Sequence, residues 1–219
     1  MKRGNIKKEG QDSLPTWFKH YTDRFLDQNG VLHPLLELKR CHSLRVAGNA
    51  RFIAEVLKFP ESDRRLAEGA GLVHDVGRFT QYRKRTDIPC GLSAGQSLFL
   101  CLIRDADKLD IMELVLRAVV IDGFQDLPEM LPHVRLSREL SPGALVEAVK
   151  TKSVSNGNLS TLADFLVMMA TWCYDINYTP TRCLAIKRGI LPRIRRELPD
   201  TNAVRALFAG ITKELLKNS

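Results

Sequence analysis

Four polar side chains interrupt apolar helical patterns in this sequence and could together hold a divalent metal ion. His74 and Asp75 stand side by side in AGLVHDVGRF, where an ordinary helix core carries apolar residues. His42 precedes an apolar stripe that begins at Val46, and Asp107 lies within IRDADKLD. Two imidazoles and two carboxylates suit Mn, Fe, Co, Ni or Zn, whereas Mg accepts nitrogen ligands less readily. We therefore expect one divalent ion, with positions left open for water and substrate.

A structure without metal could also explain each of these residues singly. His42 could cap a helix, while His74 and Asp75 could form hydrogen bonds in the interior, where polar groups are almost always paired. The four together favour a metal, because a buried carboxylate is costly unless it is paired or metal-bound. Asp105 rivals Asp107 as the last ligand, since both have apolar neighbours one turn away on the expected helix.

The spacing of apolar residues predicts an all-α fold, because they recur every three or four positions and long alternating runs are missing. The expected helices cover about residues 15–26, 34–57, 62–77, 96–120, 144–151, 160–175, 180–197 and 202–217. Polar residues with Pro and Gly predict loops over 80–95 and 123–143. The candidate ligands then come from three different helices, and the His-Asp doublet stands where the third helix ends.

Length and composition predict one helical domain. The chain has 219 residues, of which 44% are hydrophobic, enough for one substantial core. We expect a flexible basic tail over 1–13 and a single domain over 14–219, with its metal-site core at about 34–120 and further helices at about 142–219. Neither a long uncharged apolar stretch nor a signal peptide is evident, which favours a soluble cytoplasmic protein without a membrane partner.

The charge of the chain is basic, with 33 Lys and Arg against 25 acidic residues, a net charge of +8. Such a balance suits a phosphorylated small molecule or a nucleic acid. Much of the excess lies in the first eight residues and in KRGILPRIRR, as expected of a tail and a solvated helix face. Aromatic residues are not interleaved with these cations, so nucleic acid is the less favoured partner.

Three ordered motifs give the chain a resemblance to a known family. The stretches CHSLRVAGNARFIAE, GLVHDVGRF and IRDADKLDI together resemble the HD-domain superfamily of metal-dependent phosphohydrolases. The later stretch LADFLVMMATWCYDINY is similar to the C-terminal part of an uncharacterised bacterial branch. The resemblance implies an HD-domain-like helical bundle with additional C-terminal helices. It also implies His42, His74, Asp75 and Asp107 as ligands, because the last aspartate of the family follows an alanine.

The resemblance implies hydrolysis of a nucleotide or another small phosphate ester through a metal-activated water. Arg78 and Lys108, next to the expected ligands, are the cations we expect to bind the substrate phosphate, and Arg45 is a third candidate. Asp75, or the substrate itself, is the group expected to handle the proton of the attacking water. Related nucleotidases often have a glutamate soon after the doublet. Here the positions after the doublet are Val76, Gly77 and Arg78, none of which is a carboxylate.

A second hypothesis keeps the helical scaffold but not the catalysis. Residues 76–106 form a shorter segment than is usual in the bacterial branch, and they contain no histidine. A second metal would lack ligands there, and one wall of the pocket would be missing. The alternative is therefore a nucleotide-sensing or regulatory module of the same fold.

Overall fold

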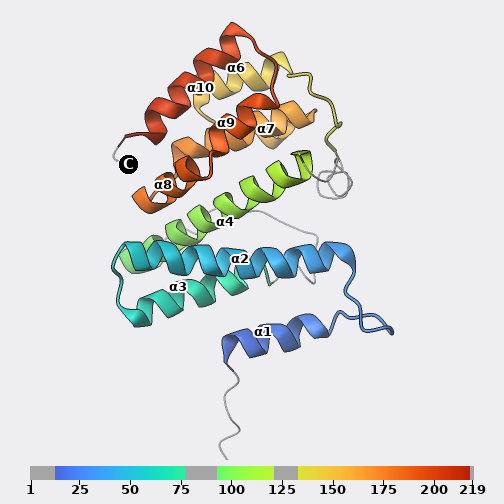
Figure 1. Ribbon diagram of the computed structural model, residues 1–219, viewed down its shortest axis with the longest axis vertical. Helices are drawn as coiled ribbons and strands as arrows, with labels where there is room; N and C mark the ends of the chain where they lie inside the picture. The colour runs from blue at the N-terminus through green and yellow to red at the C-terminus, as the bar shows by residue number, and fades with distance from the viewer. Residues whose placement is uncertain (1–12, 77–92, 121–132, 218–219) are drawn as a thin grey trace, which may run out of the picture.

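The computed structural model describes residues 13–76, 93–120 and 133–217, and the regular structure in these ranges is helical apart from two isolated bridges (Figure 1). The α-helices are α1 (Leu14–Asp23), α2 (Pro34–Val56), α3 (Glu61–Val73), α4 (Ala94–Val120), α6 (Pro142–Thr151), α7 (Leu162–Thr171), α8 (Thr179–Lys187), α9 (Ile190–Arg196) and α10 (Asn202–Leu215). Two 3-10 turns, η2 (Asn156–Asn158) and η3 (Trp172–Asp175), flank α7. The prediction of an all-α fold is confirmed.

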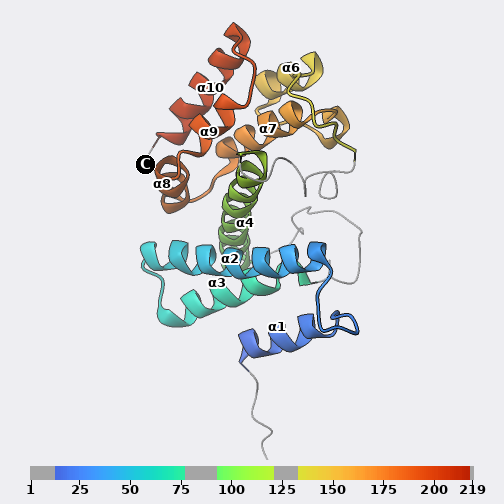
Figure 2. The same ribbon diagram turned by 45° about the vertical axis from the view of Figure 1, so that its right-hand side comes forward.

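Helix α4 crosses the middle of the molecule. In Figures 1 and 2 it lies between the α2–α3 pair and the group of C-terminal helices, and it contacts α2, α3, α8 and α9. Helix α1 packs on the far side of α3. None of the helices in the described ranges combines the length and low charge needed to cross a lipid bilayer.

Small residues bring α2 and α3 close together. The stripe of α2 that includes Val46, Ala50 and Ile53 is fully buried, as its periodicity predicts. Opposite this stripe, a Cβ atom added to Gly71 of α3 would lie only 3.0 Å from Cα of Ala47. The two backbones therefore pass each other closely near the ends that carry the predicted histidines.

The His-Asp doublet lies in a turn that follows α3. The helix ends at Val73, earlier than the predicted end at about residue 77, and His74 is its C-cap. The regular α-helix therefore ends at the doublet, although His74 itself keeps helical backbone angles. Gly77 lies outside the described residues, together with nearly all of the predicted loop over 80–95 and of the predicted tail over 1–13.

The prediction of a single helix over residues 180–197 is wrong. Helix α8 ends at Lys187 and α9 begins at Ile190. Gly189 between them has φ of 61°, in the left-handed region that ends a helix and that glycine adopts without steric cost. The interrupted helix lets α8 and α9 pack separately against α4.

Two polar residues of α4 hold the segment that joins η3 to α8. The buried carboxylate of Asp105 accepts hydrogen bonds from the backbone N and Nδ2 of Asn177 and from the backbone N of Tyr178, at 2.9 to 3.1 Å. Lys108 Nζ donates to the carbonyl oxygen of Asp175 at 2.5 Å and to its Oδ2 at 2.6 Å. The C-terminal helices are thus fastened to α4 by charged hydrogen bonds as well as by apolar packing.

We expect Asp105→Ala to lower the free energy of unfolding by about 3 kcal/mol, because it removes the buried carboxylate that accepts hydrogen bonds from Asn177 and Tyr178, and a hydrogen bond to a charged group contributes about 1.5 to 3 kcal/mol. Urea unfolding followed by far-UV circular dichroism measures this loss. Asp23→Ala is the control, since its ion pair with Lys19 one turn away lies at the surface and contributes at most about 1 kcal/mol. An Asp105→Ala variant with the wild-type urea midpoint would show that Asp105 does not stabilise the fold.

Candidate metal centre

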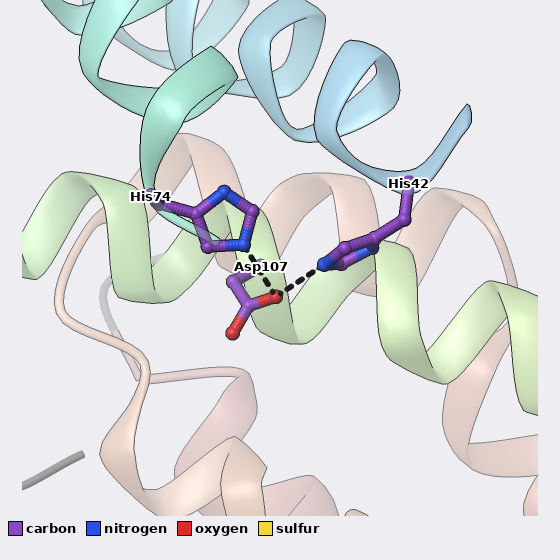
Figure 3. Close-up of side chains that lie close together, drawn as sticks. All are labelled: His42, His74 and Asp107. Carbon is purple, nitrogen blue, oxygen red and sulfur yellow. Dashed lines mark ion pairs between the residues drawn. The ribbon is translucent and has the colours of Figure 1, made fainter. Parts of the chain in front are cut away.

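Three side chains from separate helical segments meet in one cluster (Figure 3). Asp107 Oδ1 on α4 is 3.0 Å from Nε2 of His42 on α2 and 3.5 Å from Nε2 of His74, which follows α3. One donor atom from each of the three lies within 4.8 Å of the other two. The rival ligand Asp105 is bound to Asn177 instead. The structure thus favours Asp107 as the last ligand.

The hydrogen bonding of His74 leaves the lone pair of Nε2 available in the cluster. Its Nδ1 is 2.7 Å from the carbonyl oxygen of Gly71. Because a carbonyl can only accept, Nδ1 carries the proton, and Nε2 of the neutral ring is an acceptor. This Nε2 is buried and has no hydrogen-bond partner within the described part of the chain. A lone pair next to the carboxylate of Asp107 requires a positive charge nearby, which a proton or a metal cation supplies.

A carboxylate that the sequence analysis missed holds the other ring nitrogen of His42. Asp110 Oδ2 is 2.7 Å from His42 Nδ1, and Arg45 donates to both oxygens of Asp110, from Nε at 2.5 Å and from Nη2 at 3.1 Å. Asp110 follows Asp107 by one helical turn, just as Arg45 follows His42 by one turn. That matched spacing is the signal by which the sequence could have revealed the pairing.

The charges of the cluster support one another. Burial alone would lower the pKa of His42, but its hydrogen bonds to Asp107 and Asp110 raise this pKa to about 9. Burial alone would raise the pKa of Asp107, but the imidazole of His42, together with that of His74 when Nε2 is protonated, brings it below its ordinary value. The pKa of Asp110 is lowered too, because His42 and Arg45 outweigh the effect of burial. A metal ion that binds Nε2 of His42 must displace a proton that these two carboxylates stabilise.

Asp75 lies at the edge of the cluster. Its side chain is buried, with Oδ1 at 4.0 Å from Nε2 of His74 and Oδ2 at 3.8 Å from Nζ of Lys39. The closest group of donor atoms consists of the other three predicted ligands and does not include Asp75. Its roles as fourth ligand and in proton transfer stay predictions, and the position of Oδ1 is compatible with both.

Of the two cations predicted to bind phosphate, only Lys108 lies within the described residues. Lys108 is 9% exposed, and its Nζ is bound to Asp175. Neighbouring residues on a helix point about 100° apart, so Lys108 and Asp107 contact different parts of the molecule. This pairing weighs against a role for Lys108 in substrate binding. Arg78 lies outside the described residues.

Residues 40–92 match the family model of the HD domain. These residues are similar to the HD domain. The match includes His42 and the His74-Asp75 doublet, and Asp107 lies beyond it. The resemblance to the HD-domain superfamily of metal-dependent phosphohydrolases is therefore confirmed for the first two motifs. Comparisons with curated proteins and with solved structures found no match.

The donor set of the cluster fits a divalent metal ion. It comprises Nε2 of His42, Nε2 of His74 and a carboxylate oxygen of Asp107. The Nδ1 atom of each ring is held by an oxygen acceptor, the arrangement that orients histidines bound to metals. The cluster is therefore a candidate metal centre, with Asp75 as the predicted fourth ligand.

We expect Asp107→Ala and Asp75→Ala each to weaken Co²⁺ or Mn²⁺ binding by more than about 100-fold, because loss of a direct ligand should exceed the effect of losing a supporting residue. Metal per chain after equilibrium dialysis measures the effect. His33→Ala is the control, because His33 is exposed and caps the N-terminus of α2. Stoichiometric metal in Asp107→Ala would contradict the assigned centre, and stoichiometric metal in Asp75→Ala alone would reduce the ligand set to three residues.

Proposed function

We propose that this protein is a metal-dependent phosphohydrolase that acts on a nucleotide or another small phosphate ester. The observation that carries the proposal is the direction of two histidine Nε2 atoms toward Asp107, with both Nδ1 atoms held by acceptors. The HD domain supports the reaction class. A bound divalent ion supplies a Lewis acid that polarises the phosphoryl group and activates water. One ion of Mn, Fe, Co, Ni or Zn suits these ligands better than Mg.

Asp75 is the residue to which we assign proton transfer. A water that attacks phosphorus must lose a proton, and a carboxylate at the edge of the site can accept it. Asp75 Oδ1 is 4.0 Å from Nε2 of His74, so the acceptor oxygen lies beside the candidate ligands. Val76, the next residue, offers no carboxylate for this purpose.

Lys39 is the described cation that we assign to the substrate phosphate. It precedes His42 by one turn of α2, and its side chain is 26% exposed. Its Nζ is 3.8 Å from Asp75, longer than a hydrogen bond, so the ammonium keeps its donors for an incoming phosphate. By contrast, the guanidinium of Arg45 and the ammonium of Lys108 already donate to carboxylates.

A nucleotide-sensing module is the second candidate function. The observation that favours it is the short segment 76–106, which contains no histidine to hold a second metal or extend the pocket. Arg78 belongs to this segment and keeps its predicted role in phosphate binding under either function. Such a module would bind a phosphorylated small molecule at the same centre without turnover.

We expect the protein loaded with Mn²⁺ or Co²⁺ to release phosphate slowly from a nucleotide or from a small phosphomonoester such as p-nitrophenyl phosphate. EDTA should abolish the activity, and Asp107→Ala should lower kcat/KM by at least about 100-fold. Both changes remove the metal ion, which stabilises the negative charge that develops on the phosphoryl group. A panel of phosphorylated metabolites, assayed for free phosphate, provides the measurement.

One pattern of results would replace the enzyme with the sensor. It is the absence of turnover with every divalent ion across the panel, together with a rise in Tm caused by one nucleotide.

We expect Lys39→Ala to lower kcat/KM by about 10- to 100-fold, because a hydrogen bond between charged groups contributes about 1.5 to 3 kcal/mol. Metal content should remain that of the wild type. Arg40→Ala is a matched control on the same helix, since the guanidinium of Arg40 is bound to Glu37. Wild-type kinetics in Lys39→Ala, combined with a loss in Lys108→Ala, would return the phosphate-binding role to Lys108.

A further inference from the structure

Asp110 links an arginine to a histidine of the candidate metal centre. It is 3% exposed, and both of its oxygens accept hydrogen bonds from Arg45. One of these oxygens, Oδ2, also lies 2.7 Å from Nδ1 of His42. One turn of α2 therefore supplies His42 and Arg45, and one turn of α4 supplies Asp107 and Asp110. Each turn carries one candidate ligand and one residue that supports His42.

This arrangement determines which nitrogen of His42 carries a proton when a metal is bound. The ionised carboxylate of Asp110 has no hydrogen to donate, so Nδ1 of His42 must be the donor. The lone pair of the neutral ring is then on Nε2, the atom 3.0 Å from Asp107. A carboxylate that accepts from the distal nitrogen also increases the basicity of a metal-bound imidazole.

We propose that Asp110, fixed by Arg45, is a positioning residue that sets the affinity of the candidate centre for its divalent metal. The inference rests on the proposed metal-dependent function and adds to it a residue that is not itself a ligand. Asp110 acts through the orientation, the tautomer and the charge of His42.

The substitution Asp110→Asn tests this role with almost no change in shape. The amide has one acceptor oxygen where Asp110 has two, and it carries no negative charge, although Arg45 and His42 together supply three donors. When its NH₂ group faces Nδ1 of His42, the ring proton moves to Nε2 and removes the lone pair from the metal side. When its oxygen faces Nδ1, His42 keeps its tautomer but loses the charged acceptor.

The experiment titrates full-length protein with Co²⁺ and records both the dissociation constant and the visible d–d absorption. We expect Asp110→Asn to weaken Co²⁺ binding by about 10- to 100-fold and to alter the spectrum. Glu113→Gln is the matched control, because it makes the same change of charge one turn farther along α4 and disrupts a bidentate pair with Arg193. This control should keep the wild-type affinity and spectrum.

A wild-type affinity and spectrum in Asp110→Asn would overturn the inference and leave the metal centre intact. Failure of the wild type to bind Co²⁺ would instead contradict the centre itself, and with it the proposed function. A second measurement does not depend on the folding of a variant. In the Zn²⁺-loaded wild type, ¹⁵N NMR of the histidine rings should show the proton of His42 on Nδ1, and a proton on Nε2 would overturn the inference.

Discussion

The close approach of α2 and α3 at Gly71 is the constraint on which the candidate centre depends. A side chain at this position would meet the backbone of Ala47, so a larger residue would push the two helices apart. The carbonyl oxygen of Gly71 also accepts the hydrogen bond from Nδ1 of His74. One residue thus controls both the separation of His42 from His74 and the orientation of the second ring. The geometry of the site therefore depends on Gly71 having no side chain.

Charged residues that are close together in the sequence of α4 bind different parts of the molecule. Within residues 105–110, Asp105 and Lys108 bind the segment before α8, while Asp107 and Asp110 lie against His42. The rotation of about 100° per residue distributes these groups among different neighbours. Buried charges are tolerated when they are paired and hydrogen-bonded, and each pairing restricts the rotation and position of α4. The wall of the site that carries Asp107 is therefore held from both sides.

Periodicity predicts most of the helices because the core stripes are continuous, as in α2. The order of the motifs also identifies the three residues that converge, since each stands at a fixed place on its own helix. Lys108 shows the limit of this reasoning. It is next to Asp107 in the sequence, but helical rotation directs it toward Asp175. The break at Gly189 was missed because apolar residues on both sides continue a helical pattern across it.

Asp110 and Lys39 were missed for a different reason. A charged residue three positions from a ligand has the same local pattern whether it faces solvent or a neighbouring helix. The matched spacing of Arg45 and Asp110 hints at a pairing, but the distance and angle between α2 and α4, and the position of the turn after α3, decide which residues meet. Such geometry arises from packing between segments far apart in the chain, which local spacing does not encode.

The hydrogen bond between Asp105 and Asn177 has a consequence for folding during synthesis of the chain. These partners are 72 residues apart in the chain. At about 5 to 20 residues per second, a ribosome needs roughly 4 to 14 s to add the second partner after the first. During that interval α4 carries a carboxylate destined for the interior without its donors. The helices that hold the candidate ligands can gather early, but their arrangement becomes final only when the start of α8 has emerged.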